Sequence, residues 1–98
     1  MYARVSTYNG DIERLLEGFR RTTEPLSQLE GFELAYFLTD STAGQAMTVT
    51  LWESEAALAA SADWASKARE HAARDSGATV ELVHSYEVAL TAGKAAVQ

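Results

Sequence analysis

The stretch QAMTVTLWESEAAL, at residues 45–58, decides the fold because it contains a strand, a corner and the start of a helix. Its first half, residues 45–52, alternates apolar and polar side chains with the period of two that is typical of a β-strand. Ser54 then stands at a helix N-cap position, and Glu55 lies in the first turn, where the helix dipole favours an acid. The stretch therefore predicts a strand that leads directly into a helix.

The helix that begins after Ser54 is expected to run to about Arg74, and it is rich in alanine. Small side chains allow such a helix to lie close to a sheet or to another helix. Gly77 ends the connection, and residues 79–90 (TVELVHSYEVAL) predict a long final strand. A regular alternation would place these side chains on one face of that strand: Val80, Leu82, His84, Tyr86, Val88 and Leu90.

The residues before the corner predict another strand and another helix. Residues 2–8 (YARVSTY) are β-branched and aromatic, as in a strand, and Asp11 is a plausible N-cap for the helix that follows. Apolar residues recur at three- and four-residue steps over residues 12–29, which predicts one apolar helix face. Pro25 is expected to kink or restart this helix, and Gly31 to end it.

Residues 32–39 (FELAYFLT) predict a second strand, which a polar turn at residues 40–44 connects to the third strand. The element order is therefore βαββαβ, an α+β fold of ferredoxin-like type with an antiparallel sheet and two helices on one face. We expect one domain over residues 1–90 and a flexible C-terminal tail over residues 91–98.

The second strand is apolar on both faces, which has a consequence for assembly. Alternation places Phe32, Leu34, Tyr36 and Leu38 on one face, and Ala35 and Phe37 on the other. Because two helices cover only one face of the sheet, an apolar outer face would be an unusually large patch for a monomer. The sequence thus predicts a homodimer that closes sheet against sheet into an α/β barrel.

Composition excludes several classes of function. Eight basic and fourteen acidic residues give a net charge of −6, which argues against a nucleic-acid partner and against an anionic membrane surface. The chain has no cysteine, so disulfides and thiolate chemistry are excluded. We see no signal peptide and no apolar run long enough for a transmembrane helix, and we expect a cytoplasmic protein.

Three segments resemble one known family. Residues 50–58 (TLWESEAAL) are similar to the strand-to-helix corner of the antibiotic-biosynthesis monooxygenase (ABM) family, in the dimeric α/β barrel superfamily. Residues 29–34 (LEGFEL) resemble that family's entry to the second strand, and residues 85–88 (SYEV) fit its last strand. With the element order, the resemblance covers residues 2–90. It implies a dimeric barrel with a pocket in each protomer between the sheet and the two helices.

Two chemistries are implied by this resemblance. Cofactor-free members oxidise polycyclic aromatic substrates that supply their own reducing power, and in these the corner tryptophan, Trp52 here, helps to line the pocket. Haem-degrading members use a histidine and a tryptophan on the second helix and an asparagine on the first strand. Here the histidine position falls at Glu70, next to His71, the tryptophan position falls near Ser61, and the asparagine position falls at Ser6 or Thr7.

The residues themselves suggest where a site would lie. Large rings that could stack on a flat ligand are expected to line an apolar pocket, together with Ser6 and Tyr36: Phe19, Trp52 and Trp64. His71 or Tyr36 could carry a proton in catalysis. Arg4 could form an ion pair with Glu33 or Glu81 across strands, or orient an acidic or phenolic substrate. We identify no metal-ligand spacing around His71.

Three functions remain open at this point. The first is a cofactor-independent monooxygenase-like protein that acts on a small aromatic or quinone-like compound. The second is a non-catalytic dimeric binding module of the same fold, and the third is a haem-degrading monooxygenase. The side chains that line the pocket should distinguish the monooxygenase from the binding module, because an enzyme needs at least one ionisable group that faces an enclosed cavity.

Overall fold

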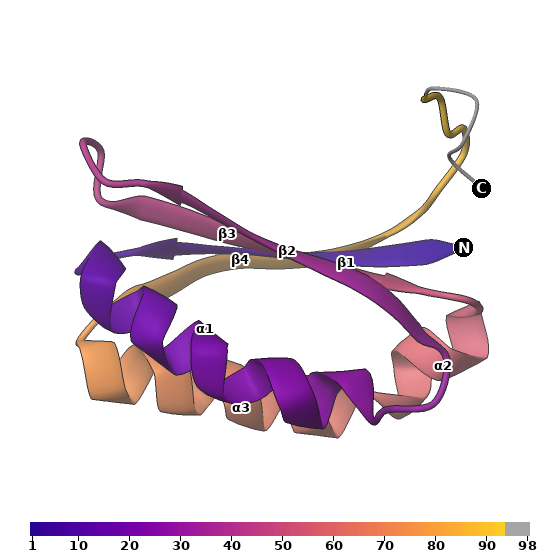
Figure 1. The fold of residues 1–98 in the computed structure, drawn as a ribbon, viewed down its shortest axis with the longest axis horizontal. Helices are drawn as coiled ribbons and strands as arrows, with labels where there is room; N and C mark the ends of the chain where they lie inside the picture. Colours follow the sequence, from indigo (N-terminus) through magenta and orange to yellow (C-terminus); the bar gives the residue numbers. More distant parts are fainter. Residues whose placement is uncertain (94–98) are drawn as a thin grey trace.

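The computed structural model describes residues 1–93 as a four-stranded sheet with helices on one face (Figure 1). Every pair of neighbouring strands is antiparallel, and the strand order is β2-β3-β1-β4. The elements are β1 (Tyr2–Asn9), α1 (Ile12–Ser27), β2 (Phe32–Asp40), β3 (Gln45–Trp52), α2 (Glu55–Ala60), α3 (Ala62–Ser76) and β4 (Thr79–Glu87). This confirms the predicted ferredoxin-like α+β fold. The part of the predicted C-terminal tail at residues 94–98 lies outside the described residues.

The corner after β3 forms as its sequence predicts. Ser54 has extended backbone angles, and its hydroxyl oxygen accepts a hydrogen bond from the Ala57 backbone N–H at 3.1 Å. That bond satisfies one of the amide donors that the first turn of a helix leaves free. The chain therefore turns from the sheet onto its helical face immediately after Trp52.

The expected single helix from residue 54 to residue 74 is two helices, with a break at Ser61. Ser61 is the C-cap of α2, with right-handed backbone angles (φ −84°, ψ −4°), and its hydroxyl donates to the Leu58 carbonyl at 2.7 Å. Arg4 donates to the same carbonyl oxygen from β1 at 2.9 Å. Because these side chains satisfy the end of α2, the chain can change direction and start α3 at Ala62.

Helix α1 also differs from its prediction, because Pro25 neither breaks nor restarts it. Pro25 lies in the last turn, and the helix continues to Ser27, with Gln28 as its C-cap. The hydroxyls of Thr22 and Ser27 donate to carbonyls three residues earlier, at 2.7 and 2.6 Å. The helix therefore ends before Gly31, and Leu29 and Glu30 belong to the connection to β2.

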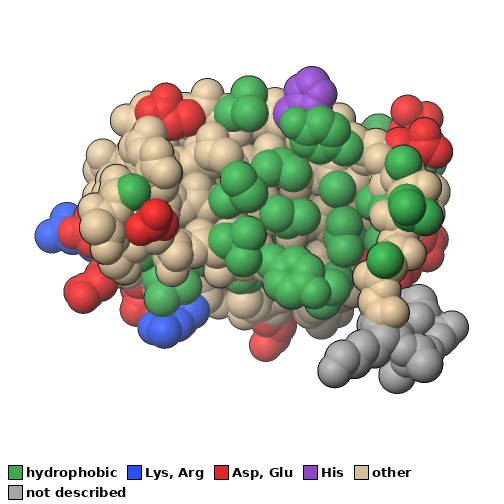
Figure 2. Space-filling view, turned by 90° about the horizontal axis from the view of Figure 1, so that it is seen from above, with side chains coloured by type: hydrophobic (Ala, Val, Ile, Leu, Met, Phe, Trp, Pro, Cys, Tyr) green, Lys and Arg blue, Asp and Glu red, His purple; other side chains and the backbone are tan. Residues whose placement is uncertain are grey.

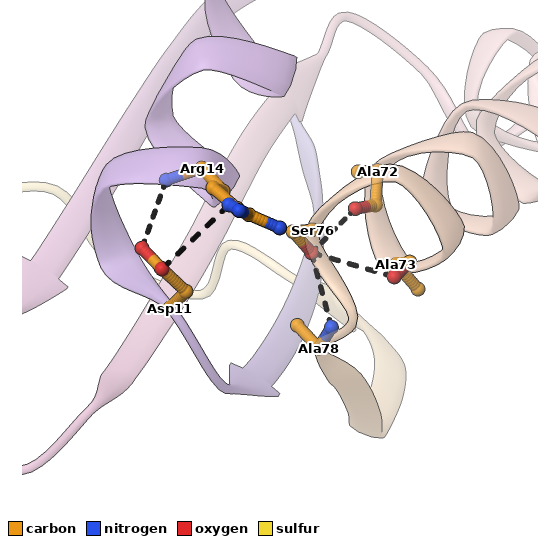
Figure 3. A network of polar contacts seen from close by, with 6 residues as sticks. All are labelled: Asp11, Arg14, Ala72, Ala73, Ser76 and Ala78. Atoms are coloured by element: carbon orange, nitrogen blue, oxygen red, sulfur yellow. Dashed lines mark hydrogen bonds and ion pairs between the residues drawn. The ribbon is translucent and has the colours of Figure 1, made fainter.

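Capping contacts fix one end of each long helix, as Figure 3 shows. Asp11 accepts a hydrogen bond from the Arg14 backbone N–H at 3.1 Å, which confirms Asp11 as the N-cap of α1. At the other end of α3, the Ser76 hydroxyl donates to the Ala72 carbonyl at 2.6 Å and accepts from the Ala78 N–H at 3.1 Å. Gly77 then adopts the left-handed conformation (φ +74°) that commonly ends a helix.

Two β-bulges change which side chains face the helices. In β2 the register shifts between Phe32 and Leu34, so Phe32 joins Ala35 and Phe37 on the helical side. The expectation that Phe32 shares a face with Tyr36 was therefore wrong. In β4 the register shifts near Glu81, so Val80 packs into the helical core. The remaining strand residues that were expected with Val80 follow the opposite face: Leu82, His84 and Tyr86.

Two hydrophobic clusters lie between the sheet and the helices. One is built around Leu15 and Phe19 of α1, Tyr8 of β1 and Ala72 of α3. The second cluster is built around Trp52, and it is completed by Leu26 and Leu58. Trp52 is fully buried at 0% exposure. The corner residue that the sequence emphasises is therefore a central packing element of the fold.

The other face of the sheet has no helix over it, and we call it the open face. Figure 2 shows it as a broad area of hydrophobic side chains, with charged side chains mainly around its edge. Large apolar residues that remain substantially exposed on it are Leu34, Tyr36, Leu38, Met47, Leu82 and Tyr86. Among residues 1–93, no helix has the length and apolar character needed to cross a bilayer.

Substituting Gly31 by alanine is expected to destabilise the fold by at least about 2 kcal/mol. Gly31 has φ +80°, and an added Cβ would collide with the Ala57 side chain. Gly77→Ala is the matched control, because Gly77 has φ +74° but no atom within 4 Å of the added Cβ. Urea unfolding should show the larger loss for Gly31→Ala. Equal losses would mean that backbone strain alone sets the effect.

Candidate functional site

A small cavity lies between the sheet and helices α1 and α3. Its free volume is about 50 Å³, and it is partly open to solvent. Strands β1, β2 and β3 form its floor, and the two long helices form its walls and roof. Its lining residues are Arg4, Ser6, Tyr8, Phe19, Thr22, Leu26, Phe37, Thr48, Thr50, Trp52, Trp64, Ala65, Ala68, Arg69 and Ala72.

Aromatic rings dominate the cavity wall. Phe19 stacks on Phe37 with ring centroids 5.2 Å apart, and Tyr8 meets Phe19 edge to face at the same distance. Trp52 lies on the floor, and its indole N–H donates to the Thr50 hydroxyl at 2.9 Å. Such rings offer flat apolar surface at fixed positions, which suits a planar organic ligand.

Tyr8 supplies an ionisable hydroxyl to this apolar space. Its side chain is almost wholly buried, and burial raises the pKa of its phenol. Hydrogen bonding with Thr48 and Ser6 and the positive charge of Arg69 oppose that rise in pKa only in part. The phenol therefore remains protonated at neutral pH and can donate a hydrogen bond to an oxygen atom of a ligand.

Arg4 is a buried cation beside the cavity, at 7% exposure. Its guanidinium donates to the Ser61 hydroxyl at 3.1 Å and to the Leu58 carbonyl at 2.9 Å. It also lies over the Trp52 ring, with 5.9 Å from the guanidinium carbon to the ring centroid. The predicted ion pair with Glu33 or Glu81 does not form. Arg4 faces the helices, whereas Glu81 is on the edge strand and accepts from Asn9.

A second hollow lies on the outside of the helical layer, between α1 and α3, and we call it the outer groove. It has a free volume of about 280 Å³, and Arg21, Lys67, His71 and Asp75 contribute its charged and titratable side chains. Four residues line both the outer groove and the cavity: Thr22, Trp64, Ala68 and Ala72. These shared residues form the partition between the two spaces.

The structure brings together four of the six residues that the sequence suggested for a site. Ser6, Phe19, Trp52 and Trp64 all line the cavity. Tyr36 does not join them, because it lies on the open face and is 52% exposed. His71 is also separate, since its exposed side chain lies in the outer groove. Among residues 1–93, no cluster of three His, Asp or Glu side chains could hold a metal ion.

Two ionisable residues of the cavity, Tyr8 and Arg69, were not among the site residues suggested by the sequence. Tyr8 shares a face with Ser6 by simple alternation along β1, and this signal is enough to place it beside the site. Arg69 lies four residues after Ala65 and three before Ala72 on α3, and this spacing places it on the buried helix face that those two alanines define.

Comparison with known proteins identifies the class of fold. No family model matches the sequence, and no curated protein matches it. The structure matches an antibiotic biosynthesis monooxygenase assigned in Deinococcus radiodurans with a TM-score of 0.74 and 15% sequence identity, over 95% of this chain and 97% of that chain. The chain therefore has the fold of the ABM proteins, which confirms the resemblance at the level of fold.

Two further solved structures show which functions this fold accommodates. SnoaB, a cofactor-independent oxygenase from Streptomyces nogalater, matches with a TM-score of 0.74 and 16% identity, over 92% of this chain and 94% of that chain. MhuD, a haem-degrader from Mycobacterium tuberculosis with two haems bound in its active site, matches with a TM-score of 0.64 and 22% identity. That match covers 95% of this chain and all of the other. The fold alone is thus compatible with either chemistry.

Proposed function

We propose that this chain is a cofactor-independent monooxygenase that oxidises a small aromatic or quinone-like compound in the cavity. The observation that carries the proposal is an aromatic-lined cavity into which an ionisable phenol, that of Tyr8, projects. An ionisable group beside an apolar cavity supports an enzyme rather than a bare binding module. SnoaB supports the proposal, because a cofactor-independent oxygenase has the same fold.

The proposed reaction leaves oxygen activation to the substrate. An activated methylene between two aromatic rings loses a proton to the solvent, to which the cavity is partly open, and the resulting enolate gives its electrons to O₂. One oxygen atom becomes the new carbonyl and the other leaves as water, so that the methylene supplies all four electrons. In the protein, Tyr8 would donate a hydrogen bond to the enolate oxygen, and the apolar walls would exclude water.

Binding of an aromatic substrate requires the cavity to enlarge. A cavity of about 150 Å³ holds one benzene ring, and the present space of about 50 Å³ is smaller. The half-buried Trp64 lies in the partition between the cavity and the outer groove. We propose that an outward turn of Trp64 joins the two spaces and admits the substrate from the helical side.

Aerobic incubation with anthrone tests this function. We expect anthraquinone to form with uptake of one O₂ per molecule and incorporation of one labelled oxygen atom from ¹⁸O₂. Tyr8→Phe should lower kcat by about a hundredfold, because loss of one hydrogen-bond donor to a developing oxyanion typically costs at least that much. Tyr86→Phe, on the open face, is the matched control and should keep the wild-type rate.

The outcome also separates the alternative functions. Saturable binding of anthrone without product would favour a binding module. If Tyr8→Phe leaves the oxidation unchanged and either Tyr36→Phe or His71→Ala abolishes it, the catalytic role belongs to Tyr36 or His71, which the sequence suggested. Failure of anthrone to bind or react would contradict the proposal.

We also propose that two copies associate through the open face. Support comes from the six large apolar side chains that remain exposed there, which form a broad patch with few charges (Figure 2). The face is a twisted sheet surface, and a two-fold axis would pack it against itself. Such a contact would bury the patch and leave the helical side, with the outer groove, accessible in each protomer.

A further inference from the structure

The cavity carries a charge opposite to that of the whole chain. The chain has a net charge of −6, yet the cavity lining contains two arginines, Arg4 and Arg69. Within residues 1–93, no aspartate, glutamate or histidine lines the same cavity. An excess of positive charge in an apolar space is costly unless something compensates it.

We propose that the cavity selects an aromatic anion, and that Arg4 and Arg69 are the residues that recognise its acidic group. The inference rests on the proposed function, in that it takes the cavity to be the substrate site. It adds the substrate class: a fused-ring compound that carries a carboxylate or an ionised phenol.

Arg4 provides a fixed cation at the floor of the site. Its two hydrogen-bond acceptors, the Leu58 carbonyl and the Ser61 hydroxyl, are both neutral. In the described part of the chain, the ion pairs are Arg14–Asp11 and Arg21–Asp75, so no carboxylate neutralises Arg4. A guanidinium has five N–H donors, and these two bonds leave donors for a ligand.

Arg69 provides the second cation from the helical wall. It is half-buried, and the described residues give it neither a hydrogen bond nor an ion pair. Burial of Arg4 and, to a lesser extent, the charge of Arg69 lower the pKa of Arg4, and both arginines line the same cavity. A bound carboxylate or phenolate between them would relieve their mutual repulsion.

The two arginines differ in what else they do, and this makes the proposal testable. Arg4 also satisfies the end of α2, so its replacement would disturb the fold as well as the site. Arg69 has no such contact among the described residues. A change at Arg69 should therefore alter ligand selection without loss of stability.

The test compares naphthoate, an aromatic carboxylate, with naphthamide, its neutral counterpart, by titration calorimetry at neutral pH. We expect wild-type protein to bind naphthoate at least about tenfold more tightly, since hydrogen bonds to charged groups contribute at least that factor. Arg69→Gln should remove most of this preference and leave naphthamide affinity unchanged. Arg74→Gln, at the exposed end of α3, is the matched control and should keep the preference.

Each outcome bears on a different claim. Equal binding of both compounds would overturn the anion proposal while leaving an aromatic site in place. Binding of neither compound would overturn the proposed substrate site itself. Picrate, an ionised phenol, distinguishes the two sources of negative charge: binding as tight as that of naphthoate indicates recognition of charge, and weaker binding assigns the site to carboxylates.

Discussion

Replacing Trp52 by alanine is expected to lower the free energy of unfolding by about 3–5 kcal/mol, the range measured for buried Trp and Phe truncations. Trp52 is fully buried and packs edge to face on Phe32 with centroids 5.5 Å apart. The Arg4 guanidinium lies over its ring. Removal of the Trp52 side chain leaves a large cavity and an unpaired Thr50 hydroxyl beneath the sheet. Urea unfolding followed by circular dichroism measures the loss.

The second tryptophan provides the comparison for this prediction. Trp64 is only half-buried, because it lies in the partition between the cavity and the outer groove. Trp64→Ala should therefore cost clearly less stability than Trp52→Ala, while it enlarges the passage to the cavity. Losses of equal size would contradict the placement of Trp52 at the centre of the core.

Substituting Tyr36 by lysine is expected to weaken self-association by at least about a thousandfold. Tyr36 lies on the open face with half of its surface exposed, so a lysine there is tolerated by the single chain. In the proposed dimer the same ammonium group would be buried against apolar side chains, at a cost of several kcal/mol per charge. Sedimentation velocity of the variant over a micromolar concentration series should show a monomer.

The control for this experiment carries the same change of charge elsewhere. Ser66 is exposed on α3, on the helical side of the molecule, and Ser66→Lys should leave the dimer intact. Wild-type protein that sediments as a monomer at tens of micromolar would contradict the proposed association directly. If both variants form dimers, the contact between the two copies does not involve the open face.

Local chemistry made much of the fold predictable. The N-caps Asp11 and Ser54 act within a few residues, so the sequence around them was sufficient to place the helix starts. The end of α3 was placed less well, because the helix runs past Arg74 to Ser76 and Gly77 is its C-cap. The bulges were not predictable in this way. A bulge is an extra residue relative to a neighbouring strand, and simple alternation has no information about that neighbour. For this reason the faces of Phe32 and Val80 were assigned wrongly.

The candidate site was predictable only where one strand or one helix face defines it. Ser6 and Trp52 follow from alternation along β1 and β3, and Phe19 follows from the apolar stripe of α1. The role of Arg4 depends on the break at Ser61, which lies 57 positions further along the chain. A hydrogen bond across that sequence separation has no signal in either segment alone.

The close approach of α1 and α3 has a consequence for how this scaffold could diversify. At their crossing Gly18 faces Ala72, and an added Cβ on Gly18 would lie 3.7 Å from Ala72, in ordinary contact. Small residues thus set the spacing of the two helices, and that spacing determines the width of the roof above the sheet. A larger side chain at either position would spread the helices while the strands stay in register. Ligand size could then be adjusted by a few helix substitutions, with the floor of the site and its charges retained.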